Sequence, residues 1–306
     1  MRRVGAMTDH DALVRSMAFQ YVDQLSEHGD RPLTWTDLNS FTFEGSGVRL
    51  VSQQGIFKPA ILDLPISIRT TFREPGELRP YEDEIDEHGY LLYRYRGMDQ
   101  NHHENVWLRR THEEGVSLLY FVGVARGLYL AHGAAIIEDH PETLTFGVQL
   151  FPIDATAVGS VSAMALDTET RRHYMSLVRR RAGQATFRES VLAAYGTKCT
   201  LCRLGHRELL DAAHIVPDSD GGASVVTNGM SMCKIHHAAY DSDIIGIRPD
   251  HVAEVKDDVL VEIDGPMLRH GLQELHGATI TVPRFHGKRP SRDALEQRYV
   301  RFRNAV

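Results

Sequence analysis

The chain has 306 residues, of which 42% are hydrophobic and 25% are charged, an ordinary composition for a globular protein. This length predicts two domains of roughly 150 residues each. The longest nearly apolar run, residues 116–125, is too short for a bilayer span of about 20 residues. No apolar segment follows the N-terminal arginines, as a secretory signal would require, so we expect a cytoplasmic location and no membrane partner.

The charge is unevenly divided between the two halves of the chain. Residues 1–160 hold 14 Lys and Arg against 23 Asp and Glu, a net of −9, whereas residues 161–306 hold 20 against 18, a net of +2. The overall charge of −7 argues weakly against a protein that merely coats nucleic acid. A local basic stretch in such a chain suits an enzyme that contacts phosphates at one place.

The first half of the chain predicts one helix followed by short strands. Residues 8–27 have helical spacing, with Thr8 as the expected N-cap. The residues expected to face a core are Leu13, Met17, Tyr21 and Leu25. Short runs broken by Gly, Pro and Asp predict strands at 48–51, 61–64, 90–93, 117–124, 129–130 and 144–151. Several short strands over about 110 residues predict a curved sheet or open barrel.

The second half predicts helices around a short ribbon. A weakly patterned segment, 156–170, is the expected linker between a domain at 1–155 and a domain at 171–306. Helices are expected at 167–183, 187–195, 233–240, 266–275 and 291–303, and strands at 259–263 and 278–282. The predicted fold class is therefore α+β.

Three cysteines and one histidine have the spacing of a metal site. The odd cysteine count argues against a disulfide framework. Cys199 and Cys202 form Cys-x2-Cys, and Cys233 and His236 form Cys-x2-His thirty residues later. Two such knuckles bring four ligands into the tetrahedron of structural zinc. The sequence thus predicts a structural Zn²⁺, with reduced core cysteines as the alternative.

A His-Asn-His series lies inside this cysteine frame. His214 stands in Ala-His-Ile-Val-Pro, and it is followed by Gly221-Gly222, Asn228-Gly229, Cys233, His236-His237 and Asp241. This series resembles the HNH nucleases of the ββα-metal class over about 45 residues. The resemblance implies that the C-terminal domain is a zinc-stabilised ββα-metal HNH endonuclease domain.

The residue types match the chemistry of phosphodiester hydrolysis, which needs a base to activate water and a cation to neutralise charge. His214 would be the general base, because imidazole titrates near the working pH. His237 would bind the catalytic Mg²⁺ or Mn²⁺. The resemblance implies that Asn228 orients either the ribbon or His214.

The chain departs from many HNH nucleases at one position. In many of them an acidic metal ligand directly precedes the catalytic His, whereas this position is Ala213 here. Asp211 would lie on the same strand face as Ala213, and Asp241 would share a helix face with His237. Either carboxylate would complete the catalytic metal site, and the sequence leaves both open.

A basic stretch precedes the first cysteine. We predict that its arginines contact DNA phosphates without reading sequence, and these are Arg171, Arg172, Arg179, Arg180, Arg181 and Arg188. Gln184, Phe187 and Arg188 also resemble a segment that precedes the zinc knuckle in bacterial HNH proteins. The alternative is a solvated helix face.

An acidic segment in the N-terminal half carries a second resemblance. Residues 79–97 resemble the signature of the SRA domain, a PUA-like curved sheet that flips a modified cytosine out of the duplex. The matching residues are Tyr81, Glu82, Asp83, Asp86, Gly89, Tyr95 and Gly97, and Asn105 matches an Asn of the downstream SRA loop. The alternative is an acidic β-turn between two strands.

The resemblance implies a modified-base pocket built from Tyr81, Asp83, Glu84, Tyr95 and Arg96. A flipped base would stack on Tyr81, and a carboxylate would accept a hydrogen bond from the exocyclic amine of cytosine. The base-reading Asp of the family falls on Glu84, and its Thr falls on Arg96. This departure leaves 5-methyl-, hydroxymethyl- and glucosylated cytosine open.

The sequence therefore predicts a modification-dependent, type IV restriction endonuclease that acts on double-stranded DNA carrying a modification, with a homodimer as one source of two active sites. Sulfur-binding domains that recognise phosphorothioate DNA are an alternative, since residues 79–81 and 94–96 would suit them too. A zinc-stabilised DNA-binding regulator without nuclease activity, or an HNH nuclease with another substrate, are further alternatives. Residues 246–306 have no predicted function, except that Arg298, Arg301 and Arg303 would add phosphate contacts.

Overall fold

The computed structural model describes residues 8–72, 84–153 and 166–305, and the chain divides into two compact units between Ala182 and Gly183. The predicted α+β class and curved N-terminal sheet are confirmed. The expected linker, 156–170, falls mostly outside the described residues, and its last three residues already belong to helix α4 (Thr168–Ala194). No helix of the described residues is long and apolar enough to cross a membrane.

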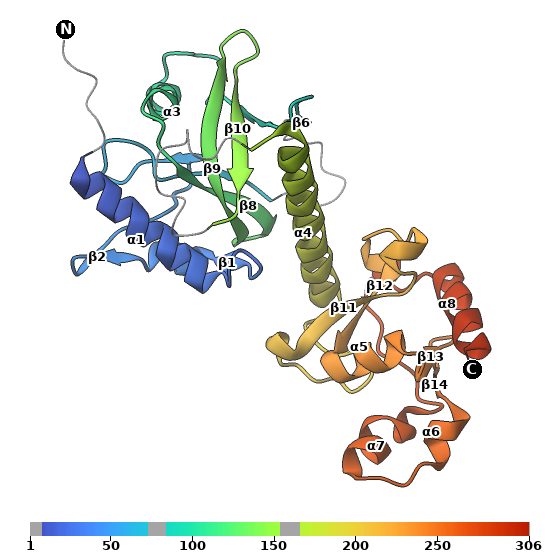
Figure 1. Cartoon of the computed structure of the whole chain (residues 1–306). Helices are drawn as coiled ribbons and strands as arrows, with labels where there is room; N and C mark the ends of the chain where they lie inside the picture. Colours follow the sequence, from blue (N-terminus) through green and yellow to red (C-terminus); the bar gives the residue numbers. More distant parts are fainter. Residues whose placement is uncertain (1–7, 73–83, 154–165, 306) are drawn as a thin grey trace, which may run out of the picture. The chain divides into compact units, whose positions relative to one another are not determined.

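Eight strands of the described residues form one sheet in the first unit (Figure 1). Its order is β4-β5-β8-β9-β10-β7-β6, and β1 also pairs with β9. All pairs are antiparallel except β5 with β8. The strands are β1 (Leu33–Thr34), β4 (Ile56–Phe57), β5 (Ser67–Thr70), β6 (Glu84–Ile85), β7 (Leu91–Arg94), β8 (Leu118–Ala125), β9 (Leu128–His140) and β10 (Thr145–Phe151). Register shifts in the β8–β9 and β9–β10 pairs increase the local twist and help the sheet to curve.

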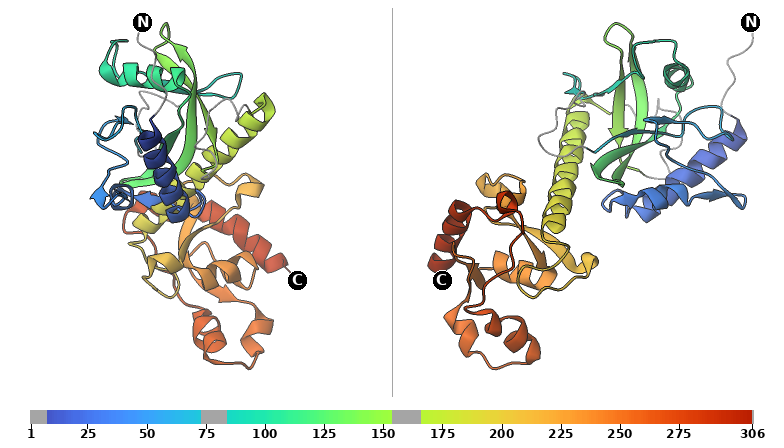
Figure 2. Two further views of the ribbon diagram at one scale, coloured as in Figure 1. Left: turned by 60° about the vertical axis from the view of Figure 1, so that its left-hand side comes forward. Right: turned by 180° about the vertical axis from the view of Figure 1, so that it is seen from behind.

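The sheet has an apolar cluster on each face because strand side chains alternate. Leu119 and Phe121 of β8 join the cluster that includes the buried residues of α1 (Asp9–Leu25). Leu118 and Tyr120 join the other cluster, to which α3 (His103–Glu113) and α4 contribute. Figures 1 and 2 show α1 and α3 beside the long strands β8, β9 and β10. A short helix α2 (Trp35–Asn39) and a hairpin of β2 (Thr42–Phe43) and β3 (Ser46–Gly47) complete this unit.

Helix α1 begins as predicted, and of the four residues expected to face the core, Tyr21 and Leu25 pack against it while Leu13 and Met17 do not. The Asp11 amide donates to Thr8 Oγ1 over 3.1 Å, so Thr8 is the N-cap. Leu13 is 51% exposed and Met17 is 39% exposed. The buried apolar positions are Val14, Ala18, Phe19 and Val22. The prediction used an i, i+4 row of large side chains, whereas the fully buried row also includes the small Ala18.

The strands predicted at 90–93, 117–124, 129–130 and 144–151 correspond to β7, β8, β9 and β10. The strands predicted at 48–51 and 61–64 are wrong, because these segments are irregular loops. Their apolar side chains are buried nonetheless, and they include Val48, Leu50, Leu62 and Leu64. Burial alone produced the strand-like pattern.

The second unit is built around a ββα arrangement. Strand β11 (Leu210–His214) pairs antiparallel with β12 (Gly229–Cys233), and α5 (Lys234–Asp241) follows directly. A second small hairpin joins β13 (Ile245–Ile247) to β14 (Ala253–Val255). The remaining helices are α6 (Asp257–Val261), α7 (Pro266–Gly271) and α8 (Arg292–Asn304).

Three predictions for this unit are corrected. The two helices expected at 167–183 and 187–195 are one continuous helix, α4 (Thr168–Ala194), because Gly183 is tolerated within it. The strand expected at 259–263 is wrong, since these residues lie at and after α6, whose first turn is favoured by Asp257 and Asp258. The segment 278–282 forms only an isolated bridge between Thr279 and Val252.

Candidate active site and metal centre

The four predicted metal ligands come together at one end of the β11–β12 ribbon. The ligand atoms of Cys199, Cys202, Cys233 and His236 all lie within 4.8 Å of one another. His236 Nδ1 is 3.4 Å from Cys199 Sγ and 3.2 Å from Cys233 Sγ, and the sulfurs of Cys202 and Cys233 are 3.9 Å apart. Tetrahedral ligands at 2.0–2.3 Å from one ion would be roughly 3.3–3.8 Å apart. The cluster therefore fits a tetrahedral metal site.

The cysteines of this cluster differ in protonation. Hydrogen bonding with Cys233 lowers the pKa of the Cys199 thiol, which favours the thiolate that binds metals, whereas burial raises the pKa of Cys202 and hydrogen bonding with Cys199 raises that of Cys233. His236 Nε2 donates a hydrogen bond to the Gly271 carbonyl oxygen over 2.7 Å. This places the proton on Nε2 and leaves the lone pair of Nδ1 directed at the thiols.

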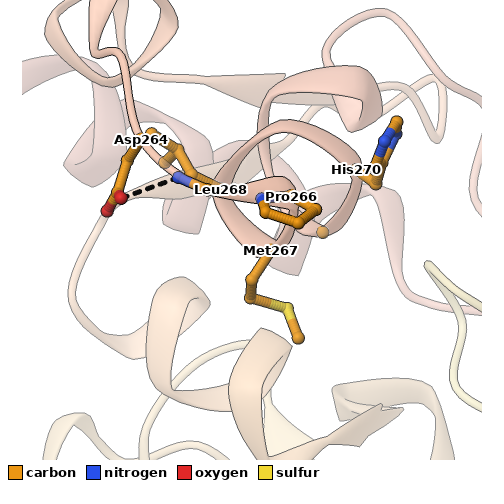
Figure 3. A pocket seen from close by; sticks show the side chains of 7 residues that line it. Asp264, Pro266, Met267, Leu268 and His270 are labelled. Atoms are coloured by element: carbon orange, nitrogen blue, oxygen red, sulfur yellow. Dashed lines mark hydrogen bonds between the residues drawn. The ribbon is translucent and has the colours of Figure 1, made fainter.

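Gly271 connects the metal cluster to a surface pocket on α7. The pocket has a volume of about 580 Å³, and its walls include Asp264, Met267 and His270 (Figure 3). The Asp264 carboxylate accepts a hydrogen bond from the Gly265 amide over 2.7 Å. None of the predicted catalytic residues lines this pocket, so the candidate active site lies elsewhere in the unit.

His214 ends strand β11, opposite Gly229 of β12. Its ring stacks on Phe187 of α4, with ring centroids 4.0 Å apart and planes inclined by 21°. Its Nε2 lies 3.4 Å from Ser224 Oγ. Partial burial lowers the pKa of His214, and the Asp218 charge opposes this only in part. The imidazole is therefore neutral at neutral pH, as a general base must be.

The Asn228 side chain is buried and clamps the loop that follows His214. Its Oδ1 accepts a hydrogen bond from the Val216 amide over 2.9 Å. Its Nδ2 donates to the carbonyl oxygens of Val216 and Ala223, each over 3.0 Å. Within the described residues, no hydrogen bond joins Asn228 to His214. Of the two roles left open by the sequence, the geometry matches orientation of the ribbon.

His237 lies between the two carboxylates that the sequence left as alternatives. Its Nε2 is 3.2 Å from Asp241 Oδ2 on the same helix, α5, and its Nδ1 is 3.8 Å from Asp211 Oδ2 on β11. Hydrogen bonding with Asp241 is the main cause that raises the pKa of His237. The three side chains supply the oxygen and nitrogen donors that Mg²⁺ or Mn²⁺ accepts.

Several of the predicted DNA-binding arginines contact the protein itself. Arg171 donates to the His88 carbonyl over 3.0 Å, and Arg172 donates to the Glu87 carbonyl. Arg181 forms an ion pair of 3.0 Å with Asp30. Arg188 donates to the Leu210 carbonyl over 2.7 Å at the start of β11. Arg179 and Arg180 have exposed side chains.

The predicted base pocket is only partly within the described residues, because Tyr81 and Asp83 lie outside them. Glu84 is in β6, opposite Leu92. Tyr95 is buried, stacks on Phe146 at 4.5 Å and bonds through its hydroxyl to Asp139. Tyr95 therefore packs in the core of the first unit. Arg96 is exposed.

The acidic segment contains a hairpin turn between β6 and β7. Asp86 Oδ1 accepts hydrogen bonds from the amides of His88, over 2.9 Å, and Tyr90, over 2.8 Å. Gly89 has a φ of +85°, which favours glycine in a tight turn. The side chain of Asn105 binds the main chain of Arg96, with its Oδ1 2.7 Å from the Arg96 amide nitrogen. These contacts match the alternative of an acidic β-turn.

Sequence reasoning missed three neighbours of the site. Ser224 and Asp218 reach His214 only because the loop between β11 and β12 folds back. The Gly271 carbonyl reaches His236 across 35 residues of sequence. No sequence pattern near these residues indicates such contacts. Phe187 differs, because it lies in the segment before the first cysteine that resembles other HNH proteins.

Residues 199–248 match the HNH endonuclease family. The matched range includes the metal cluster, His214, Asn228 and His237, and its core is the ββα arrangement described above. The chain therefore contains an HNH endonuclease domain. No curated protein matches the chain.

Two solved structures are similar to this chain at a low level. A modification-dependent TagI restriction endonuclease is 15% identical with a TM-score of 0.32, and the match covers 83% of this chain and 86% of that one. The type IV phosphorothioation-dependent restriction endonuclease ScoMcrA is 15% identical with a TM-score of 0.23, covering 60% of this chain and 51% of that one. Similarity of this degree defines neither the fold nor the function of this chain.

Proposed function

We propose that the protein is a modification-dependent DNA endonuclease that hydrolyses phosphodiester bonds near a modified cytosine, 5-methyl- or hydroxymethylcytosine. The nuclease part rests on one observation. Within an HNH endonuclease domain, strand β11 ends at His214, which is neutral and stacked on Phe187. The same strand places Asp211 against His237.

In this proposal His214 accepts the proton of the attacking water. Its Nε2 lies 3.4 Å from the Ser224 hydroxyl, and the ring nitrogen that carries no hydrogen receives the proton. Asn228 holds the strand end in place through Val216, so that the ring keeps its direction during the reaction. His237, Asp241 and Asp211 would hold Mg²⁺ or Mn²⁺, which when bound neutralises charge on the phosphate and the leaving oxygen.

We assign a structural Zn²⁺ to Cys199, Cys202, Cys233 and His236. The donor set, the separations of its atoms and the proton on His236 Nε2 support this assignment. The ion would tie the start of the unit to α5, which carries His237.

The choice of a modified cytosine rests on the SRA-like residues of the N-terminal segment, and domain 1–155 is proposed as the recognition domain. Its curved sheet is the kind of scaffold that the resemblance implies. Double-stranded DNA carrying the modification would be the partner, and a homodimer would supply two active sites.

The test is digestion of matched plasmids that are unmodified, methylated, hydroxymethylated or phosphorothioated, with Mg²⁺ or Mn²⁺. We expect the wild type to cut methylated or hydroxymethylated DNA. His214→Ala should lower the rate by about 10²–10⁴-fold, the usual contribution of a general base. His206→Ala is the matched control, because His206 is an exposed histidine of the same unit and should leave the rate unchanged.

Each other outcome supports a different function. Cleavage of only the phosphorothioate plasmid would favour a sulfur-binding N-terminal domain. Equal cleavage of all plasmids would remove the modification dependence and keep the nuclease. DNA binding without any cleavage by the wild type would favour a DNA-binding regulator.

A further inference from the structure

A cationic segment lies just before helix α8. Residues 284–292, here called the 284–292 segment, contain Arg284, Lys288, Arg289, Arg292 and His286, and no Asp or Glu. Arg284, His286, Lys288 and Arg292 have exposed side chains. Phe285, among these cations, is 76% exposed. Exposure of a large aromatic ring costs hydrophobic free energy, so a ligand that covers the ring would bind favourably here.

The arginines of α8, which the sequence suggested as phosphate contacts, are already paired. Arg298 is buried and bonds to Asp243, and Arg301 lies 3.3 Å from the same carboxylate. Arg303 lies 3.9 Å from Glu254. By contrast, no carboxylate of the described residues pairs with Arg284 or Lys288. The uncompensated positive charge of this part of the unit therefore lies in the 284–292 segment.

The 284–292 segment is fixed against the loop that supports the active site. Its 3₁₀ helix η7 (His286–Lys288) packs against η5 (Val226–Asn228). The Ser291 amide donates to the Thr227 carbonyl over 2.8 Å. Arg289 Nε donates to the Pro283 carbonyl over 3.2 Å, which closes the segment on itself.

Two sets of contacts link the segment to the strand end that carries His214. Asn228, the last residue of η5, grips Val216 through its side chain, and Val216 is two residues after His214. The segment therefore packs on the same loop that fixes the strand end carrying His214. Cations that hold phosphates and an aromatic ring that covers a base or sugar are the usual elements of a nucleic-acid contact.

We propose that the 284–292 segment is a DNA-contact element of this unit, in which Arg284 and Lys288 bind backbone phosphates and Phe285 packs against the DNA bases or sugars beside the cleavage site. This inference rests on the proposed function and names the surface by which the substrate reaches the ribbon. The contact is independent of base sequence, because phosphates are alike along the duplex.

The test measures binding of the full chain to a short unmodified DNA duplex at several salt concentrations. All proteins carry His214→Ala so that the DNA stays intact. Binding weakens as salt rises, and each lost phosphate contact reduces the steepness of log K against log salt by about 0.9. Arg284→Gln with Lys288→Gln should therefore reduce this steepness, called the slope below, by about 2. Arg284→Lys with Lys288→Arg should restore the slope.

The matched control removes two exposed cations of the same unit outside the segment, through Arg207→Gln with Arg269→Gln. This control should keep the wild-type slope. Phe285→Ala should bind about tenfold more weakly at one salt concentration, in the range found for lost aromatic stacking. Phe285→Tyr should bind like the parent protein, because it keeps the ring.

Three outcomes separate this inference from the proposed function. If the wild-type protein cleaves DNA but the variant of Arg284 and Lys288 has an unchanged slope, only the DNA-contact element is overturned. A lowered slope in a protein whose wild type cleaves no DNA supports the element and overturns the nuclease. Equal losses in the variant and in the control show a general charge effect and overturn the element.

Discussion

His214 is held by residues that the HNH motif does not contain. Phe187 stacks on its ring, and a Cβ atom on Gly229 would lie only 2.8 Å from Phe187. The glycine after Asn228 therefore leaves space for the aromatic ring beside the ribbon. Phe187 is a positioning residue in this view, since it acts through the orientation of His214.

We expect Phe187→Leu to lower kcat by about 10- to 100-fold with little change in KM, because small displacements of a catalytic group cost rates of this order. Phe187→Tyr should keep most of the rate, since it preserves the stack. Val191→Ala is the control, because Val191 also packs against Gly229 from α4. Steady-state cleavage kinetics would decide, and an equal loss of kcat in the control would show that packing, not stacking, matters.

The protonation of His214 makes a second prediction at this scale. Burial lowers its pKa from the ordinary value, so the ring stays neutral to a pH below about 6.5. Because only the neutral ring accepts a proton, the cleavage rate should fall on the acidic side with a midpoint below that value. The nearby Asp218 raises the pKa of His214, so Asp218→Asn should move the midpoint to lower pH.

The control for this pH profile is Asp220→Asn, because Asp220 is an exposed carboxylate of the 3₁₀ helix η4 (Asp218–Asp220) that also contains Asp218. It should leave the midpoint in place. A midpoint that moves to higher pH in Asp218→Asn would contradict the assignment of the acidic limb to His214.

At the scale of elements, the loop between β11 and β12 determines the geometry of the site. Gly222 packs so closely that a Cβ atom there would overlap the Val216 carbonyl and lie 2.9 Å from Asn228 Nδ2. Gly221 has a φ of +81° and open space around it. The two neighbouring glycines thus serve different purposes, close packing at Gly222 and a left-handed turn at Gly221.

We expect Gly222→Ala to lower the free energy of unfolding by about 2 kcal/mol, as overpacking of a close contact usually does. It should also slow cleavage, because the added methyl displaces the amide that clamps the strand end behind His214. Gly221→Asn should be milder, since asparagine tolerates a left-handed conformation. Denaturant unfolding and cleavage assays would test this prediction. It would be wrong if Gly222→Ala had the unfolding free energy and the cleavage rate of the parent protein.

Elements with a clear periodicity or cap could be predicted from the sequence. These are strands β7, β8 and β10 and helices α1, α5 and α8. The segments at 48–51 and 61–64 are loops with buried apolar side chains, and burial without strand pairing produces the same apolar pattern as a strand. Only long-range pairing separates the two cases.

At the scale of the whole molecule, each of the two units has its own apolar core. The first unit has clusters on both faces of its sheet, and the second has a cluster around the ribbon and a smaller one at the cysteines. The metal cluster belongs only to the second unit. Its loss should therefore affect the two units differently.

We expect removal of Zn²⁺ by a chelator to lower the unfolding temperature of the second unit by more than about 10 °C, because structural zinc contributes on the order of 10 kcal/mol. The transition of the first unit should stay in place. His236→Ala should reproduce the effect without chelator, whereas His270→Ala, an exposed histidine of the same unit, should not. Differential scanning calorimetry that showed one unchanged profile would overturn the structural role of the metal.

Residue types at short spacings were enough to predict the Cys3His cluster, the HNH domain and the division into a sheet-rich and a ribbon-containing half. Tertiary structure decided what long-range packing controls. It placed both Asp211 and Asp241 against His237, and it set the buried row of α1. It also turned Arg188 and Arg298 into internal contacts and left Arg284 and Lys288 exposed. A charge pattern cannot make that distinction, since the partner of each cation comes from a distant part of the chain.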